Sequence, residues 1–266
     1  MIHPSAVIGP EVELDEGVEI GPFCYLMGRI KLGPANRLIS HVTILGDTEL
    51  GPANVLHSNV VIGDEPQDVE YRGGRREVRI GARNIFREGV TIHRGSEHGE
   101  RTVIGDDNFL MQNAHVAHDC RIGNFTIIAG GAILAGWVEV ADRAIISGNC
   151  AVHQYVRIGR LAFMRGLART SRDVPPFCVL SDTHTVRAIN VVGLRRAGFA
   201  PATIGALRQA FKILFGRRRN LRLALAELVA QGPRGAEVDE LVEFIRQSRR
   251  GVAFGPAQAS DAAQSE

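Results

Sequence analysis

An aliphatic side chain recurs at every sixth residue over the first two thirds of the chain. Counting in steps of six from Ile2 to Met164, 25 of 28 positions carry Ile, Leu, Val, Phe or Met. The three exceptions are Asp68, Gly74 and His98. A period of six matches neither the 3.6-residue period of a helix nor the spacing of about 8–12 residues between strands of a β-sandwich. It is typical of a hexapeptide β-helix, in which each short strand points one aliphatic side chain into a narrow interior.

Three hexapeptides make one triangular coil of about 18 residues, so the repeat predicts about nine coils over residues 1–168. Glycine follows many of the aliphatic residues, as at Gly21, Gly33 and Gly105, and 30 of the 266 residues are glycine. Because glycine adopts left-handed backbone conformations readily, we expect the chain to turn its corners at these glycines.

Two segments interrupt the period without shifting it, and we expect both to be loops that leave a corner of the β-helix. The first spans residues 64–78 and the second spans residues 94–101. Loops on a rigid scaffold are where binding and catalytic residues concentrate, although surface decoration is the plainer interpretation. We assign residues 1–190, with both loops, to an all-β domain formed by a parallel β-helix.

The period becomes helical near the C-terminus. Apolar residues recur at helical spacing over 204–214, 221–229 and 238–245, which predicts three helices. Residues 191–250 are therefore expected to form a small α-helical domain that covers one end of the solenoid, since exposed terminal coils require a cap. The tail, 251–266, is small and polar and is expected to be disordered.

Composition excludes several classes of protein. The 31 basic and 29 acidic residues nearly balance, which argues against a nucleic-acid binder. No apolar stretch approaches the roughly 18 residues that a membrane span needs, and the N-terminus does not resemble a signal peptide. The four cysteines form no CxxC pair, so we expect neither a disulfide framework nor a structural zinc site. A reduced, cytoplasmic protein is the expectation.

The coil period predicts which polar residues meet at one corner. Residues about 18 apart stack one strand spacing apart, which places His118, Gly136 and Gln154 in one column. An imidazole base, a backbone N–H without a covering side chain and an amide suit acyl transfer, which needs a general base and an oxyanion donor. By the same arithmetic, His57 and His93 share another corner.

Two other interpretations of these histidines stay open. They are solvated corner residues without a chemical role, or they bind a metal. Neutral imidazoles suit zinc, and His93, His115 and His118 are the candidate ligands, brought together across an interface of a trimeric β-helix.

Arginine clusters mark three candidate surfaces for an acidic partner or a phosphate, although most such runs are only solvated faces. They are Arg72, Arg75, Arg76 and Arg79; Arg195 and Arg196; and Arg217, Arg218 and Arg219.

Five segments on these repeats resemble one family. They are VTIHRG (90–95), NAHVAHDC (113–120), AVHQY (151–155), DVPPF (173–177) and GLRRAGF (193–199). In this order they resemble the UDP-N-acetylglucosamine O-acyltransferases, which use acyl carrier protein and open lipid A biosynthesis. The resemblance covers about residues 1–250. It implies a homotrimer of left-handed β-helices with active sites between subunits, no cofactor and no bound metal, and an acidic acyl carrier protein that docks on a basic surface.

The resemblance also implies roles for individual residues. His118 is the catalytic base, the Gly136 N–H binds the oxyanion, and Asp119 orients His118, although neighbouring strand residues normally point to opposite faces. Gly166 falls where the family sets acyl-chain length. The remaining matches are substrate contacts, with the last two on the nucleotide side: Gln67, Asp68, His93, His115, His153, Gln154, Asn190 and Arg196.

Three positions depart from the family pattern. Glu70 replaces a lysine, Trp137 replaces a histidine, and Val192 replaces an acidic residue. A carboxylate beside a diphosphate is repulsive unless a cation intervenes, and Arg72 is the candidate for that cation. The departures leave four hypotheses open: the usual ester-forming transfer, transfer onto a UDP-3-amino sugar to give an amide, a non-catalytic UDP-sugar-binding relative, and a metal-dependent hydratase resembling the γ-class carbonic anhydrases.

Overall fold

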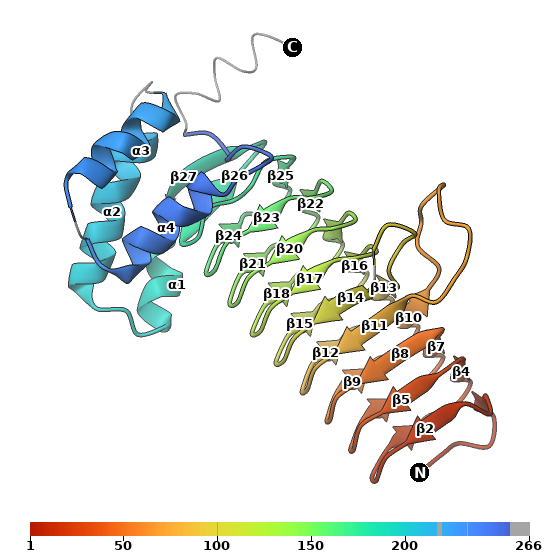
Figure 1. The fold of residues 1–266 in the computed structure, drawn as a ribbon. Coiled ribbons are helices and arrows are strands. Elements are labelled where there is room, and N and C mark those ends of the chain that lie inside the picture. Colours follow the sequence, from red (N-terminus) through yellow and green to blue (C-terminus); the bar gives the residue numbers. More distant parts are fainter. Residues whose placement is uncertain (100, 217–219, 233, 256–266) are drawn as a thin grey trace.

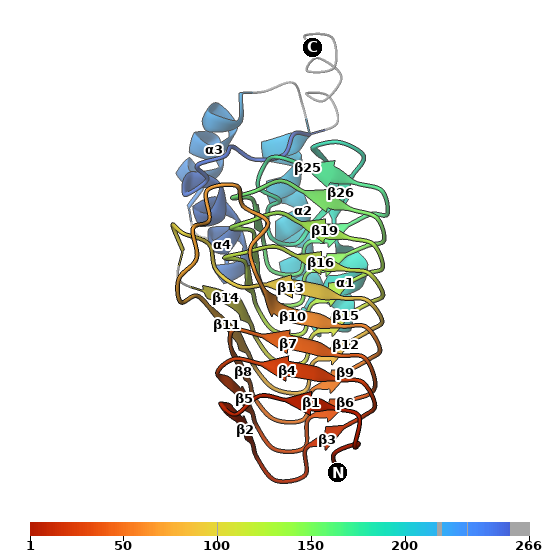
Figure 2. The same ribbon diagram turned by 90° about the vertical axis from the view of Figure 1, so that its right-hand side faces the viewer.

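The protein is a left-handed parallel β-helix with helices beside its C-terminal coils (Figures 1 and 2), which confirms the predicted fold class. The computed structural model describes residues 1–99, 101–216, 220–232 and 234–255. Three parallel sheets form the sides of the β-helix, and we name each sheet after its first strand.

The strands of each sheet follow in spatial order. The β1 sheet contains β1 (Val7–Ile8), β4 (Tyr25–Met27), β7 (Thr43–Leu45), β10 (Val61–Asp64), β13 (Thr91–His93), β16 (His115–Val116), β19 (Ile133–Leu134), β22 (Ala151–Val152) and β25 (Arg169–Thr170). The β2 sheet contains β2 (Val12–Leu14), β5 (Ile30–Leu32), β8 (Asp47–Leu50), β11 (Glu77–Ile80), β14 (Arg101–Ile104), β17 (Arg121–Ile122), β20 (Glu139–Val140) and β23 (Arg157–Ile158). The β3 sheet contains β3 (Glu19–Ile20), β6 (Arg37–Leu38), β9 (Val55–Leu56), β12 (Ile85–Phe86), β15 (Phe109–Leu110), β18 (Ile127–Ile128), β21 (Ile145–Ile146), β24 (Phe163–Met164), β26 (Cys178–Ser181) and β27 (Thr185–Ile189).

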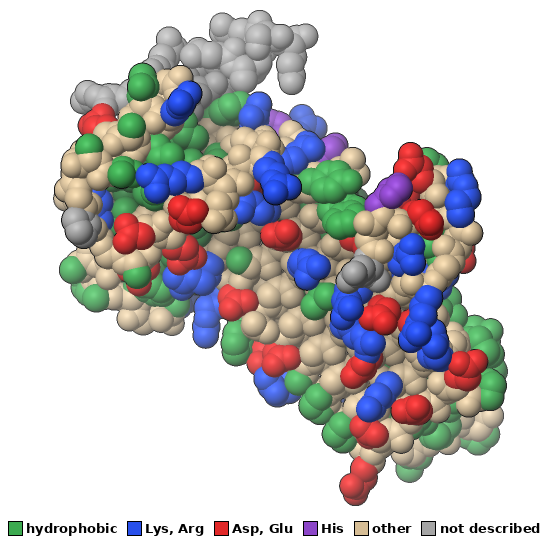
Figure 3. All heavy atoms as spheres, viewed as in Figure 1, with side chains coloured by type: hydrophobic (Ala, Val, Ile, Leu, Met, Phe, Trp, Pro, Cys, Tyr) green, Lys and Arg blue, Asp and Glu red, His purple; other side chains and the backbone are tan. Residues whose placement is uncertain are grey.

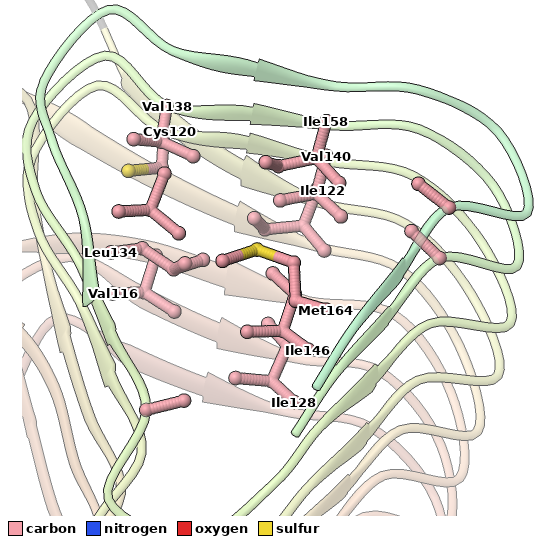
Figure 4. Close-up of a cluster of buried hydrophobic side chains, with 14 of the residues drawn as sticks. Val116, Cys120, Ile122, Ile128, Leu134, Val138, Val140, Ile146, Ile158 and Met164 are labelled. Atoms are coloured by element: carbon pink, nitrogen blue, oxygen red, sulfur yellow. The ribbon is translucent and has the colours of Figure 1, made fainter. Parts of the chain in front are cut away.

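The predicted aliphatic column forms the core of the β-helix. From Ile20 onward, every aliphatic residue of the six-residue period is buried, whereas Ile2, Ile8 and Leu14 lie in the exposed first coil. Figure 4 shows these side chains converging from the three sheets. Residues two positions earlier form a second buried column. It includes the ladder Asn36, Asn54, Asn84 and Asn108, in which each side-chain oxygen accepts a backbone N–H from the next coil.

The corners correct the role expected of glycine. Gly21, Gly33 and Gly105 do not have positive φ; the left-handed residue lies two positions later and is usually another amino acid, as at Phe23 (φ 59°) and Ala35 (φ 58°). There is no room for a side chain at these glycines. A Cβ on Gly21 would lie 1.8 Å from the carbonyl oxygen of residue 39 in the next coil. Close approach between successive coils, not backbone freedom, therefore requires glycine there.

Both predicted loops leave the same edge of the β-helix, between the β1 and β2 sheets. The loop that the resemblance assigns to the sugar acceptor (the acceptor loop), residues 65–76, joins β10 to β11. The Ser96 loop, with described residues 94–99, follows β13 and precedes β14. The loops predicted from the sequence are slightly too long, because four of their residues belong to strands: Asp64, Glu77, Val78 and Arg101. Figures 1 and 2 both show the two loops side by side.

The helices α1 (Val191–Arg196), α2 (Pro201–Phe215), α3 (Leu221–Ala230) and α4 (Ala236–Arg246) follow the last coils. Periodicity predicted the last three helices. It missed α1, which has only six residues, and the antiparallel pairing of β26 with β27. Among the described residues, no helix combines the length and the apolar character that crossing a membrane requires.

The tail differs from the expectation of disorder at its start. Val252 pairs with Asp173 and Phe254 pairs with Thr185, both in β-bridges. These bridges hold the first residues of the predicted tail against the last coil, so the prediction of disorder is wrong for residues 251–255. Residues 256–266 lie outside the described residues.

Candidate active site

His118 and Asp119 form a hydrogen-bonded pair at the edge between the β1 and β2 sheets. The distance from His118 Nδ1 to Asp119 Oδ2 is 2.9 Å. Because Asp119 has φ 59°, the two residues sit in a turn, where the alternation of strand side chains does not apply. The carboxylate only accepts, so Nδ1 carries the hydrogen and Nε2 keeps its lone pair in the neutral ring.

The carboxylate of Asp119 is buried, with 2% of its side chain exposed. Burial acts to raise the pKa of Asp119, but hydrogen bonds from His118 and Ser96 outweigh burial and hold that pKa below the usual range. The Ser96 backbone N–H donates to Oδ2 at 2.9 Å. Asp119 therefore stays ionised beside His118.

Gly136 lies under the imidazole of His118, one coil further on, as the column predicts. A Cβ on Gly136 would lie 2.4 Å from His118 Cε1 and 2.6 Å from Nε2, so only glycine leaves room for the ring. Within the described residues the Gly136 N–H donates no hydrogen bond. The glycine that packs against the imidazole therefore has a backbone donor without a partner among the described residues.

Gln154 and His153 occupy the next coil of the same edge and are exposed. Arg250, beyond α4, approaches His153 with 3.3 Å between Nη2 and Nδ1, and its Nε donates to the Ser171 carbonyl at 3.2 Å. The sequence missed Arg250, because nothing in its local pattern brings the C-terminal segment to this edge.

His93 and His115 lie together on the β1 sheet, with ring centroids 5.3 Å apart. His93 donates from Nδ1 to the Glu65 carbonyl, and His115 Nδ1 lies 2.8 Å from the Thr91 hydroxyl. Burial, with the nearby His93 and His118, lowers the pKa of His115 to about 4. His115 is therefore neutral at physiological pH.

This pKa predicts acid sensitivity of the fold. Between about pH 6.5 and pH 4 the unfolded chain binds a proton on His115 that the folded protein excludes, so the free energy of unfolding falls as pH falls. Above that range both states are neutral at this residue. Thermal unfolding at about pH 7.5 and about pH 5 should show a smaller loss of Tm for His115→Gln than for the wild type. Equal losses would contradict the assignment.

The acceptor loop carries Gln67 and Asp68. Asp68 Oδ1 accepts the backbone N–H of Glu70 at 3.0 Å, which shapes the loop, and Gln67 is exposed. Glu70 pairs with His98 of the Ser96 loop at 3.0 Å. Arg72, the candidate cation between Glu70 and a diphosphate, donates to the carbonyls of residues 69 and 71 of its own loop.

Asn190 and Arg196 lie elsewhere, on the edge between the β2 and β3 sheets. Asn190 caps α1: its Oδ1 accepts from the Gly193 N–H and its Nδ2 donates to the Leu161 carbonyl, each at 2.9 Å. With Arg196 and the exposed Val192 it lines a cavity of about 570 Å³ against the outer face of β18, β21 and β24. One chain therefore does not bring these residues to His118.

Gly166 and Trp137 lie at two different edges of the β-helix. Gly166 is exposed at the edge between the β3 and β1 sheets, where a Cβ would have 3.7 Å to its nearest neighbour. Trp137 stacks on Tyr155 of the next coil, with ring centroids 5.8 Å apart. This aromatic pair lies directly beside the His118 column.

The structure bears on the proposed metal ligands and on the arginine clusters proposed to bind an acidic partner. Among the described residues, no group of three or more His, Cys, Asp or Glu side chains is arranged to hold a metal ion. Figure 3 looks onto the β2 sheet, where basic and acidic side chains are interspersed. Arg75 pairs with Asp47, and Arg79 with Glu49 and Glu77, so these two members of the first arginine cluster are engaged in ion pairs. Arg195 and Arg196 are exposed, and 217–219 lie outside the described residues.

The β-helix carries a histidine–aspartate pair on one edge, and its six-residue repeat is that of the bacterial hexapeptide-repeat transferases. The family model for the bacterial transferase hexapeptide matches residues 101–136. The model described as "Udp N-acetylglucosamine O-acyltransferase; Domain 2" matches residues 173–253.

Full-length relatives specify the family. The chain is 44% identical over 253 residues to the acyl-[acyl-carrier-protein]--UDP-N-acetylglucosamine O-acyltransferase of Thermodesulfovibrio yellowstonii, covering 94% of this chain and 98% of the relative. Identity to the protein of the same name from Alkalilimnicola ehrlichii is 43% over 254 residues, with the same coverage. The solved structure of Francisella novicida UDP-N-acetylglucosamine acyltransferase matches with a TM-score of 0.91 at 34% identity, covering 98% of this chain and 96% of that one. This chain belongs to the UDP-N-acetylglucosamine O-acyltransferase family, which confirms the resemblance seen in its segments.

Proposed function

We propose that this protein transfers an acyl chain from acyl carrier protein to the 3-hydroxyl of UDP-N-acetylglucosamine, the first step of lipid A biosynthesis. The observation that carries the proposal is the His118–Asp119 pair beside the free Gly136 N–H. The names of the relatives support the substrates.

His118 Nε2 removes the proton from the sugar 3-hydroxyl as that oxygen attacks the thioester carbonyl carbon. The Gly136 N–H donates to the oxyanion of the tetrahedral intermediate. Collapse of the intermediate breaks the carbon–sulfur bond, and the imidazolium returns its proton to the leaving thiolate. Asp119 stabilises the imidazolium in between.

The substrate contacts follow the edge that carries His118. Gln67 and Asp68 on the acceptor loop, with His115 on β16, face the sugar in this proposal. The remaining proposed contacts are His93, His153 and Gln154. Gly166 lies at a different edge, between the β3 and β1 sheets, so in this proposal it belongs to a neighbouring copy of the chain, where it leaves room for a long acyl chain.

The nucleotide side of the site requires a second copy of the chain. Asn190 and Arg196 lie on a different edge from His118, so in this proposal they reach the nucleotide from a neighbouring subunit of a homotrimer. Exposed Arg195 offers the acidic carrier protein a basic contact. Sedimentation equilibrium should give the mass of three copies of the 28.9 kDa chain. A monomer in the active sample would exclude the shared site.

An acyl-transfer assay read by mass spectrometry tests the reaction. UDP-N-acetylglucosamine and its 3-amino analogue would each be offered with carrier-protein thioesters of several chain lengths. An ester product supports the proposal. An amide product alone would move the acceptor to a 3-amino sugar, which the departure at Glu70 makes the second candidate. No product with either acceptor would reject the proposed reaction.

A further inference from the structure

Four residues from three segments form a connected chain of hydrogen bonds that ends at His118. Arg76, the last residue of the acceptor loop, donates from Nε to the Ser96 carbonyl at 2.6 Å. Its Nη2 donates to the Glu97 carbonyl at 3.1 Å. The Ser96 N–H in turn donates to Asp119 Oδ2, the same oxygen that His118 Nδ1 contacts.

The carboxylate of Asp119 depends on this chain for its orientation. Its other oxygen, Oδ1, is buried without a hydrogen-bond partner within the described part of the chain. Gly99 packs directly against it, since a Cβ there would lie 1.7 Å from Oδ1. Ser96 is therefore the residue outside the pair that fixes the carboxylate by hydrogen bonding.

Arg76 holds the part of the Ser96 loop that carries Ser96. Ser96 itself is 1% exposed. The two bonds from Arg76 hold consecutive carbonyls of the loop with the planar fork of one guanidinium, an arrangement that an ammonium group does not reproduce. Arg94, at the start of the Ser96 loop, also joins the two loops through the Tyr71 hydroxyl and the Glu65 carboxylate. The exposed pair of His98 and Glu70 is a weaker link.

We propose that Arg76 is a positioning residue: it ties the acceptor loop to the Ser96 loop and thereby fixes Asp119 against His118. The proposal rests on the proposed role of His118 as general base. It makes the acceptor loop part of the catalytic apparatus as well as a surface for the sugar. Movement of that loop displaces the carboxylate that stabilises the imidazolium.

A double-mutant cycle on the full-length protein tests this coupling. Arg76→Ala is expected to lower kcat about tenfold, because a small misplacement of a catalytic group is costly. It should also move the acid side of the kcat pH profile to lower pH, since the imidazolium loses part of its stabilisation. In an Asp119→Asn background, Arg76→Ala should cost less than about twofold. Arg76→Lys, which keeps the positive charge but not the planar fork, should fall between Arg76→Ala and the wild type.

Arg75→Ala is the matched control, because Arg75 lies in the same loop but pairs with Asp47 on β8. It should leave kcat and the pH profile unchanged. Equal losses from Arg76→Ala in both backgrounds, or an unmoved pH profile, would overturn the proposal while the acyltransferase assignment stood. An inactive wild type would instead count against the proposed function. If Arg76→Ala does not fold, the same cycle with Arg76→Lys decides.

Discussion

Replacing His118 with Ala is expected to lower kcat by about two to four orders of magnitude and to leave the β-helix folded. The imidazole is the base of the proposed reaction, with Nε2 free and Nδ1 bonded to Asp119. Its side chain lies outside the aliphatic core, so its removal leaves that core intact. Steady-state acyl transfer and circular dichroism would measure the two effects separately.

The control for His118→Ala is His41→Asn. His41 also lies at a corner, with φ 51°, a conformation that asparagine tolerates, but it lies at a different edge of the β-helix. The His41→Asn variant should retain the wild-type kcat. An active His118→Ala protein would refute the general-base assignment, and a collapsed fold would show that the residue is structural.

Replacing Gly136 with Ala is expected to lower kcat about a hundredfold or more. The added methyl group would lie 2.4 Å from His118 Cε1, so the ring must move away from Asp119 and from the Gly136 N–H. Displacing a catalytic group by about 1 Å commonly costs about two orders of magnitude. KM for the sugar should change much less than kcat, because the methyl group acts on the base.

Gly205→Ala provides the comparison for Gly136→Ala. Gly205 lies within α2, and a Cβ there meets nothing within 4 Å. Alanine at this position should stabilise the helix by about 0.5–1 kcal/mol and leave kcat unchanged. A crystal structure of Gly136→Ala with His118 in its original place, or full activity of that variant, would remove steric support as the reason for this glycine.

The sequence predicted the β-helix because the interior has one repeating requirement, an aliphatic residue at each sixth position. It predicted the His118 and Gly136 column because no insertion separates these residues. It failed for His57 and His93, which lie after β9 and at the end of β13, in different sheets. The reason is the two loops. Leu50 pairs with Ile80 and Ile80 pairs with Ile104, so the loops add 12 and 6 residues to a coil. Insertions of these lengths keep the six-residue period and break the 18-residue one.

Other features had no sequence signal to find. Arg76 binds backbone carbonyls, which every residue presents, so its partners leave no pattern in the side chains. The pairing of Asp119 with His118 depends on a left-handed corner residue, and corner residues in this chain are mostly not glycine. The bridges of Val252 and Phe254 depend on where α4 delivers the chain, which periodicity does not define.

Residues at the edge between the β1 and β2 sheets and residues of the interior are under different constraints. Interior positions, which at this edge include Cys120, Val138 and Val156, determine whether the chain folds, while the described residues of its two loops lie outside the buried core. Substitutions there can change substrate preference at small cost in stability. Glu70 and Trp137, two of the three departures from the family pattern, lie on this edge. The interior column, by contrast, is apolar from Ile80 through Met164, with the single exception of His98 in the Ser96 loop. A protein built this way can acquire a new acceptor by drift along one edge, with its scaffold unchanged.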